Sequence, residues 1–192
     1  MQKSAISEFK KWFKKAQKNN LITADHMILA TVAKNRRPSA RTLLLKGIDE
    51  KGFQFFTNYN SRKSQEINDN AFGALVFNWF NIRMQVRVEG QISKLTRQES
   101  IAYFKTWPRL SQLGAWASPQ SKTIPDRQFL TNKVKFFEKK FKDVEVPCPP
   151  HWGGYLLKPN FVDFMFLQEN RLHDRFTYRK AGSTWVIKRI AP

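Results

Sequence analysis

Residues 41–63 of this chain (RTLLLKGIDEKGFQFFTNYNSRK) constrain its fold more than any other stretch. Residues 42–45 and 53–57 are two apolar and β-branched runs separated by a turn, which is the pattern of two adjoining β-strands. Two asparagines then break the pattern, and Ser61 stands where the N-cap of a helix is expected. The stretch therefore predicts a strand, a turn, a second strand and the start of a helix.

The first turn of this expected helix carries two cations, Arg62 and Lys63. Because a first turn has unpaired N–H groups and a partial positive charge, cations are unfavourable there unless an anion supplies the missing charge. A phosphate group would do so, and Arg41 and Lys46 would add two cations if a bulge or a strand end brought them to the same side. The alternative is a solvated basic turn in a basic protein, and the local sequence leaves both interpretations open.

Basic residues are in large excess: 34 Lys and Arg against 15 Asp and Glu in 192 residues give a formal net charge of +19. Such an excess attracts nucleic acid, acidic membranes or phosphorylated small molecules. Many of the lysines surround apolar stripes in two expected amphipathic helices, residues 4–19 and a helix that begins near Pro125. A solvated helix surface therefore explains much of the charge, and we expect no specific nucleic-acid partner.

Cys148 is the only cysteine, so an internal disulfide is impossible and a reducing compartment, the cytoplasm, is expected. No apolar run reaches about 18 residues, so no membrane span is expected. The N-terminus also lacks the apolar core of a secretory signal. The three histidines are scattered along the chain, and we expect no metal site.

Short strands and helices alternate along the rest of the chain. Residues 106–123 are the least regular stretch and are predicted to form a loop. We expect one domain over residues 1–192 of the α+β class, in which a mostly antiparallel sheet or barrel carries appended helices. The further expected strands are residues 27–33, 72–79, 83–93, 161–167, 172–178 and 184–190.

Residues 171–175 (RLHDR) concentrate charge in a short segment. On a strand, Arg171, His173 and Arg175 would share one face, and Asp174 would point to the other. Three cationic or potentially cationic groups on one face repel one another, and Asp174 cannot relieve this from the opposite face. An anionic or electron-rich ligand would relieve it, and a solvent-exposed strand face is the alternative.

Several segments form a set whose order and spacing are more specific than any one motif. They are residues 41–46 (RTLLLK), 56–63 (FTNYNSRK), 84–90 (MQVRVEG), 103–121 (YFKTWPRLSQLGAWASPQS), 152–154 (WGG), 171–175 (RLHDR) and the ending 185–192. Together they resemble the pyridoxamine 5′-phosphate oxidase family over nearly the whole chain. The resemblance implies an FMN-binding split β-barrel that forms a homodimer, with strands of about residues 150–192 in dimerisation and the active site.

The resemblance also implies an activity: FMN-dependent oxidation of pyridoxine or pyridoxamine 5′-phosphate to pyridoxal 5′-phosphate, with O2 as electron acceptor. Arg171 and His173 resemble the pair that covers the substrate ring opposite the flavin, and they are the expected catalytic residues. The expected substrate-binding residues are Lys46, Tyr103, Ser111, Arg171 and His173. The expected FMN-binding residues, some from the second subunit, are Arg41, Lys46, Phe56, Thr57, Arg62, Lys63, Gln85, Gln120, Ser121 and Arg175.

The chain departs from the family pattern at several positions. Trp107 stands where the family usually has a second phosphate-binding Arg, and Met165 and Phe166 stand where it usually has Trp and Gln. Phe56 replaces a common Tyr, and an N-terminal segment that helps to close over the substrate is expected to be lacking, because residue 4 already begins the first helix. The alternatives are a related flavin oxidoreductase with a different substrate and a flavin-binding module without turnover.

Overall fold

The computed structural model of the chain describes residues 4–19 and 23–192. Within these residues, nine strands form one antiparallel sheet with the order β2-β1-β5-β6-β7-β4-β3, and β8 and β9 continue it from β7. The strands are β1 (His26–Val32), β2 (Pro38–Leu44), β3 (Gly47–Ile48), β4 (Phe53–Asn58), β5 (Phe72–Trp79), β6 (Met84–Lys94), β7 (Trp152–Phe166), β8 (Asp174–Ala181) and β9 (Thr184–Arg189).

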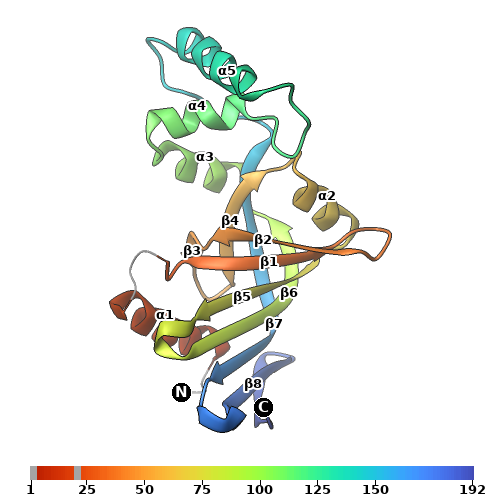
Figure 1. The fold of residues 1–192 in the computed structure, drawn as a ribbon. Helices are drawn as coiled ribbons and strands as arrows, with labels where there is room; N and C mark the ends of the chain where they lie inside the picture. The colour runs from red at the N-terminus through yellow and green to blue at the C-terminus, as the bar shows by residue number, and fades with distance from the viewer. Residues whose placement is uncertain (1–3, 20–22) are drawn as a thin grey trace.

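The shape of the sheet follows from β7, its longest strand. One edge of β7 pairs with β6, while the other pairs with β4 over residues 152–157 and with β8 over residues 161–166. The register between β6 and β7 shifts between Glu89 and Gly90, and such bulges bend a sheet. A Cβ on Gly90 would lie 2.1 Å from the Lys158 carbonyl oxygen, so only glycine fits. The β4 end and the β8 end therefore lie at opposite ends of β7 (Figure 1).

The described residues include five α-helices, and three of them gather at the β4 end of the sheet (Figure 1). One of these three, α3, begins with a capping box, in which Thr96 Oγ1 accepts from the Glu99 N–H and the Glu99 carboxylate accepts from the Thr96 N–H. The helices are α1 (Ala5–Asn19), α2 (Arg62–Asp69), α3 (Arg97–Lys105), α4 (Arg109–Ala117) and α5 (Arg127–Lys140).

Aromatic packing holds α1 against the curled sheet. The fully buried Phe9 ring meets Phe53 of β4 and Phe77 of β5 edge-on, with ring centroids 4.8 Å apart in both pairs. A smaller cluster that includes Phe104 and Trp152 fixes the helical end to the start of β7. Burying each of these side chains contributes about 1.5–3 kcal/mol, so both clusters stabilise the fold.

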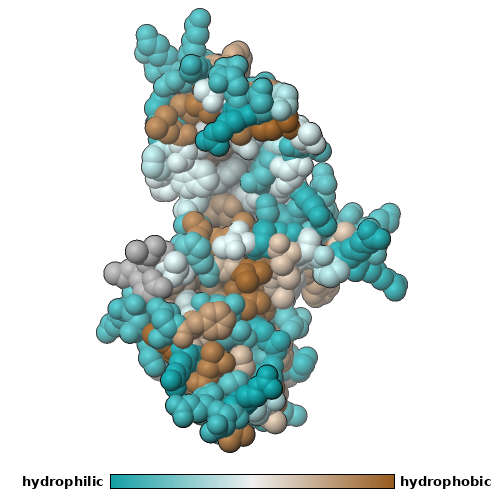
Figure 2. Space-filling view, in the orientation of Figure 1, coloured by the Kyte–Doolittle hydropathy of each residue, from teal (hydrophilic) through white to brown (hydrophobic). Residues whose placement is uncertain are grey.

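The lysines of α5 lie where the amphipathic pattern predicts them. Lys133, Lys135, Lys139 and Lys140 are all exposed, and hydrophilic side chains cover the outer surface of α5 in Figure 2. In the part of the chain that the structure describes, no helix is long and apolar enough to cross a membrane.

The expected α+β class, with a mostly antiparallel sheet and appended helices, is confirmed. Four details of the prediction are wrong. Strand β2 begins at Pro38 instead of residue 42. Arg109–Ala117 forms helix α4 inside the stretch predicted as a loop, because Leu113 and Ala117 bury one of its faces. Strand β7 begins at Trp152 instead of residue 161, and β8 begins at Asp174 instead of residue 172.

Candidate functional site

The junction between β4 and α2 positions the first group of predicted site residues. Ser61 takes the N-cap position with extended backbone angles, as expected from the sequence. Asn58 holds the turn before it, because its Oδ1 accepts from the Asn60 N–H at 2.8 Å. Arg62 and Lys63 therefore lie in the first helical turn, where the free N–H groups of α2 also point.

A buried carboxylate, Glu66, joins this helix to the neighbouring strands. Its Oε2 accepts from Thr31 Oγ1 at 2.6 Å, from Ser39 Oγ at 2.6 Å and from Arg41 Nη2 at 3.1 Å. Its Oε1 accepts from Arg62 Nε at 2.9 Å. Burial raises the pKa of this carboxyl, but these hydrogen bonds and the charge of Arg41 outweigh it and lower the pKa to about 2.

The Lys63 ammonium group lies beside this network and is only 8% exposed. It donates to Thr57 Oγ1 at 3.1 Å, to Ser61 Oγ at 3.3 Å and to Gln120 Oε1 at 3.3 Å. Burial and the nearby Arg41 lower the pKa of Lys63 to about 8, and Glu66 partly opposes this. An anion placed here would raise that pKa again, so the site favours a negatively charged ligand.

A cavity of about 280 Å³ adjoins Lys63, and aromatic rings form one of its walls. Phe56 stacks on Tyr103 with ring centroids 3.9 Å apart and on Trp152 at 5.5 Å. Trp107 meets Trp152 edge-on at 4.8 Å. The cavity is lined by Leu43, Phe56, Thr57, Asn58, Trp107, Ser111, Gly114, Ala115, Ser118, Gln120 and Trp152. The structure thus brings several predicted cofactor and substrate residues to one place.

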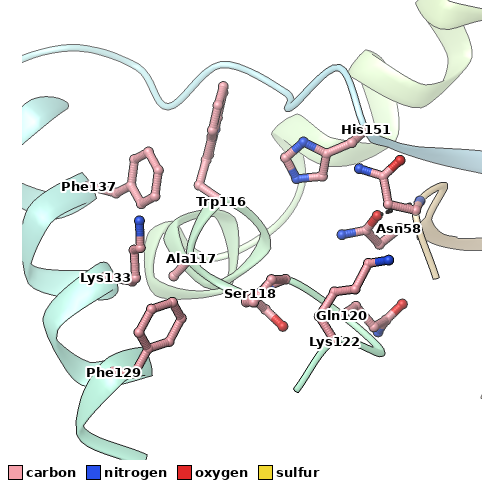
Figure 3. A pocket seen from close by; sticks show the side chains of 12 residues that line it. Asn58, Trp116, Ala117, Ser118, Gln120, Lys122, Phe129, Lys133, Phe137 and His151 are labelled. Carbon is pink, nitrogen blue, oxygen red and sulfur yellow. Dashed lines mark hydrogen bonds between the residues drawn. The ribbon is translucent and has the colours of Figure 1, made fainter. Parts of the chain in front are cut away.

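A second cavity of about 340 Å³ opens between α4 and α5 and shares Asn58, Ser118 and Gln120 with the first. Figure 3 shows Phe129 and Phe137 of α5 on one side of it and Gln120 on the other. Since its remaining lining residues are outside the predicted set, we assign the site to the smaller cavity.

The second group of predicted residues lies at the other end of β7. Gln85 of β6 pairs with Met165 of β7, which pairs with Arg175 of β8, so the three side chains form one row on one face of the sheet. Beside this row, the buried Asp163 accepts from Arg175 Nη2 at 2.7 Å and from Arg87 Nη2 at 2.5 Å. These hydrogen bonds raise the pKa of the Arg175 guanidinium above its usual value.

Arg171 and His173 do not lie on a strand, which corrects the predicted arrangement of 171–175. Arg171 ends a 3₁₀ turn, Glu169–Arg171, and has a left-handed backbone with φ of 63°, while β8 begins only at Asp174. His173 is held in the loop because its Nδ1 accepts from the Gln168 N–H at 3.1 Å. The expected repulsion is also relieved by protein groups, since Asp163 neutralises Arg175.

Two further predicted residues are outside the two groups: Lys46 lies apart from both, and Ser121 lies at the margin of the first. Lys46 lines a different cavity, where its Nζ is 3.3 Å from Asp25 Oδ2. Ser121 follows Gln120 on the surface with a left-handed φ of 67°. Within the described residues, Arg41 contacts Glu66 and Lys46 contacts Asp25, so the two cations face different groups.

The two groups of predicted residues are far apart within the chain. Thr57 pairs with Gly153, and Gln85 and Arg175 pair with Met165, so the groups are separated by twelve residue steps of β7. At roughly 3.3 Å per residue this is about 40 Å along the strand, which is longer than one flavin nucleotide.

Comparisons with known proteins agree with this geometry. Residues 13–140 match the family described as pyridoxamine 5′-phosphate oxidase. The chain belongs to the pyridoxamine 5′-phosphate oxidase family. Residues 152–192 match a region described as the pyridoxine 5′-phosphate oxidase C-terminal dimerisation region, which here comprises β7, β8 and β9.

Curated relatives in the pyridoxamine 5′-phosphate oxidase family are similar over almost the full chain. The pyridoxine/pyridoxamine 5′-phosphate oxidase of Coxiella burnetii is 46% identical and covers 97% of this chain and 95% of its own length. That of Azotobacter vinelandii is 47% identical and covers 97% of this chain and 88% of its own length. The predicted family is therefore confirmed.

Solved structures of the family share the fold. PhzG from Burkholderia lata 383, in complex with tetrahydrophenazine-1-carboxylic acid, has a TM-score of 0.92 at 26% identity and covers 97% of this chain and 92% of its own. A pyridoxamine 5′-phosphate oxidase-related, FMN binding protein from Nostoc punctiforme has a TM-score of 0.78 at 21% identity and covers 100% of both chains. The predicted split β-barrel is confirmed.

Sequence patterns missed two carboxylates that organise this family member's site. Glu66 stands four residues after Arg62, a spacing at which helix side chains meet, and this signal was present in the sequence. Asp163 is a lone charge in the apolar run FVDFMF, which also marks it as unusual. Their partners Arg41 and Arg87 come from other strands, and no local pattern predicts those pairings.

Proposed function

We propose that this chain is an FMN-dependent oxidase that converts pyridoxine or pyridoxamine 5′-phosphate to pyridoxal 5′-phosphate. The observation that carries the proposal is the cluster of Arg41, Arg62 and Lys63 at the start of α2, beside an aromatic-walled cavity. FMN, when bound, accepts a hydride equivalent from the substrate and passes the electrons to O2, which yields hydrogen peroxide. The chain itself binds, orients and shields the reacting groups.

The residues at α2 fit the terminal phosphate of FMN. Lys63 is buried as a cation with neutral partners, and the first-turn N–H groups of α2 point toward the same place. Charge-assisted hydrogen bonds of this kind favour a dianion. Riboflavin, which lacks the phosphate, is expected to bind more weakly.

The substrate position follows from the remaining residues. Ser111 lines the cavity and Tyr103 stacks on its Phe56 wall, and both would contact the substrate phosphate. Arg171 and His173 would cover the substrate ring from the second group. Lys46, beside Asp25, would contribute its charge only after leaving that partner. The cytoplasmic location and the absence of a specific nucleic-acid partner stay predictions.

The active unit is proposed to be a homodimer. The two groups of site residues are about 40 Å apart along β7, so a second copy must supply Gln85 and Arg175 to the cavity of the first. The match to a dimerisation region supports the same assembly. Light scattering on the purified protein should give the mass of two chains. A monomer that still binds FMN tightly would contradict this arrangement.

The function is tested by reduction of the bound flavin. Purified protein should be yellow, and anaerobic addition of pyridoxine 5′-phosphate should bleach it, because the substrate is the only electron donor present. Admission of air should restore the colour with formation of hydrogen peroxide. Protein that binds FMN but is not bleached would instead support a flavin oxidoreductase with another substrate, an alternative that Trp107 and the ligand of PhzG motivate.

A further inference from the structure

The Glu66 carboxylate holds two cations from different elements of the fold. It is 3% exposed and contacts Arg41 from β2 and Arg62 from its own helix, so it fixes both at the start of α2. We propose that Glu66 is the positioning residue of the FMN phosphate site: it orders Arg41 and Arg62 before the cofactor binds and sets the net charge that the phosphate meets. This inference rests on the proposed FMN-dependent function.

The donor groups of the two arginines indicate different tasks. Arg41 directs Nη1 to the Leu29 carbonyl and to Thr31 Oγ1, and Nη2 to Ser39 Oγ and Glu66. Four of its five N–H donors are therefore occupied. Among the described residues, Arg62 has a partner only at Nε, and its side chain is 65% exposed. Arg41 thus supplies a fixed charge, and the terminal nitrogens of Arg62 are free to bind an anion.

The charges at the site match the expected ligand. Arg41, Arg62 and Lys63 are three cations, and Glu66 is one anion, which leaves two positive charges. A phosphate monoester carries close to two negative charges at neutral pH and above. Without Glu66, three cations would repel one another around the empty site, and Arg62 would lose its tether. The carboxylate therefore makes the site stable before FMN binds and still attractive to a dianion.

A purely structural role for Glu66 is the competing explanation, since it also ties α2 to β1 and β2 through Thr31 and Ser39. Lys63 distinguishes the two roles. The charged groups that act on it are Arg41 from β2 and Glu66 from α2, while Thr57, Ser61 and Gln120 are neutral. Glu66 raises the pKa of Lys63. Removing the Glu66 charge must therefore change how FMN binding depends on pH. Losing only the hydrogen bonds from Thr31 and Ser39 to Glu66 would not change that pH dependence.

The test measures FMN affinity by flavin fluorescence between pH 6.5 and 9.5, with Glu66→Gln, Glu66→Asp and wild-type protein. Wild-type affinity should fall as pH rises through about 8, because above that pH binding must restore the proton on Lys63. In Glu66→Gln the fall should begin at lower pH, and affinity at pH 7 should drop by roughly tenfold as Arg62 is released. Riboflavin affinity should stay unchanged in all three proteins.

Two variants separate charge from geometry. Glu66→Asp keeps the charge but is too short to reach Arg62, so its affinity should fall while the pH of the decline stays near that of wild type. Glu99→Gln makes the same chemical change in the capping box of α3 and should change neither the FMN affinity nor the pH at which that affinity declines. If Glu66→Gln shows the wild-type affinity and pH dependence, Glu66 is only an anchor. If wild-type protein itself does not bind FMN, the proposed function fails instead.

Discussion

Replacing either Arg171 or His173 with alanine should slow reduction of the bound flavin by roughly a hundredfold, the cost of removing one well-placed hydrogen-bond donor from a reaction site. Within one chain neither residue contacts Arg62 or Lys63, and in the proposed dimer both would meet the substrate ring and not the FMN phosphate, so both variants should stay yellow. One hydrogen bond decides which nitrogen of the His173 ring can donate a proton. Its Nδ1 accepts from the Gln168 N–H, so in the neutral ring Nε2 carries the proton and is free to donate toward the substrate.

Anaerobic stopped-flow mixing with pyridoxine 5′-phosphate measures this effect directly, and FMN content is measured on the same samples. Leu172→Ala provides a matched control, because it shortens an exposed side chain of the same loop, at 73% exposure, without removing a polar group. A loss of FMN in His173→Ala would show that the loop holds the cofactor. A wild-type rate of reduction in both variants would remove the pair from the proposed site.

The start of α2 was predictable because its signals are local. A strand end, two asparagines, an N-cap serine and two cations follow one another in a few residues, and the structure places Ser61 at the N-cap as expected. The capping box of α3, Thr96 and Glu99, is a local signal of the same kind. Where neighbouring residues determine the backbone, the sequence alone predicts the element and its boundary.

The errors arose where distant contacts decide the structure. Residues 109–117 are rich in small and polar residues, and they form α4 because Leu113 is part of the buried cluster that includes Phe104 and Trp152. The start of β7, WGG, contains two glycines, which weaken strand propensity, but all three residues pair with β4. In both cases, contacts with residues distant in the sequence outweighed the local secondary-structure preference.

In the candidate site, too, local signals predicted some features and distant contacts determined the others. Alternation predicted a strand through 171–175, but Asn170 and Arg171 both adopt left-handed backbones that end the regular pattern. No local signal in the sequence requires this turn. Sequence reasoning thus named residues that the structure groups together but missed how Glu66 of α2 and Asp163 of β7 hold them. Their partners, Arg41 of β2 and Arg87 of β6, are distant in the sequence.

Exchanging Trp107 for arginine should lower the Michaelis constant for a phosphorylated substrate by roughly tenfold, the value of one recovered charged contact. Trp107 lines the same cavity as Ser111, which would hold the substrate phosphate. The gain should have a cost in stability, because Trp107 packs against Trp152 with ring centroids 4.8 Å apart and against Tyr103 at 6.3 Å. Losing these contacts should destabilise the fold by about 1–3 kcal/mol, which lowers the melting temperature by several degrees.

Steady-state kinetics with phosphorylated and unphosphorylated pyridoxine separates the two effects, because only the phosphorylated form gains from the new charge. Trp116→Arg is the matched control: it makes the same exchange in α4, where Trp116 lines the larger neighbouring cavity and donates to the Pro147 carbonyl. That variant should lose stability without lowering the Michaelis constant. If Trp107→Arg leaves the constant for the phosphorylated substrate unchanged, the cavity beside Ser111 does not hold that phosphate. Trp107 would then indicate a cavity that binds an aromatic substrate of another class. Bleaching of the flavin by candidate aromatic electron donors would test this prediction.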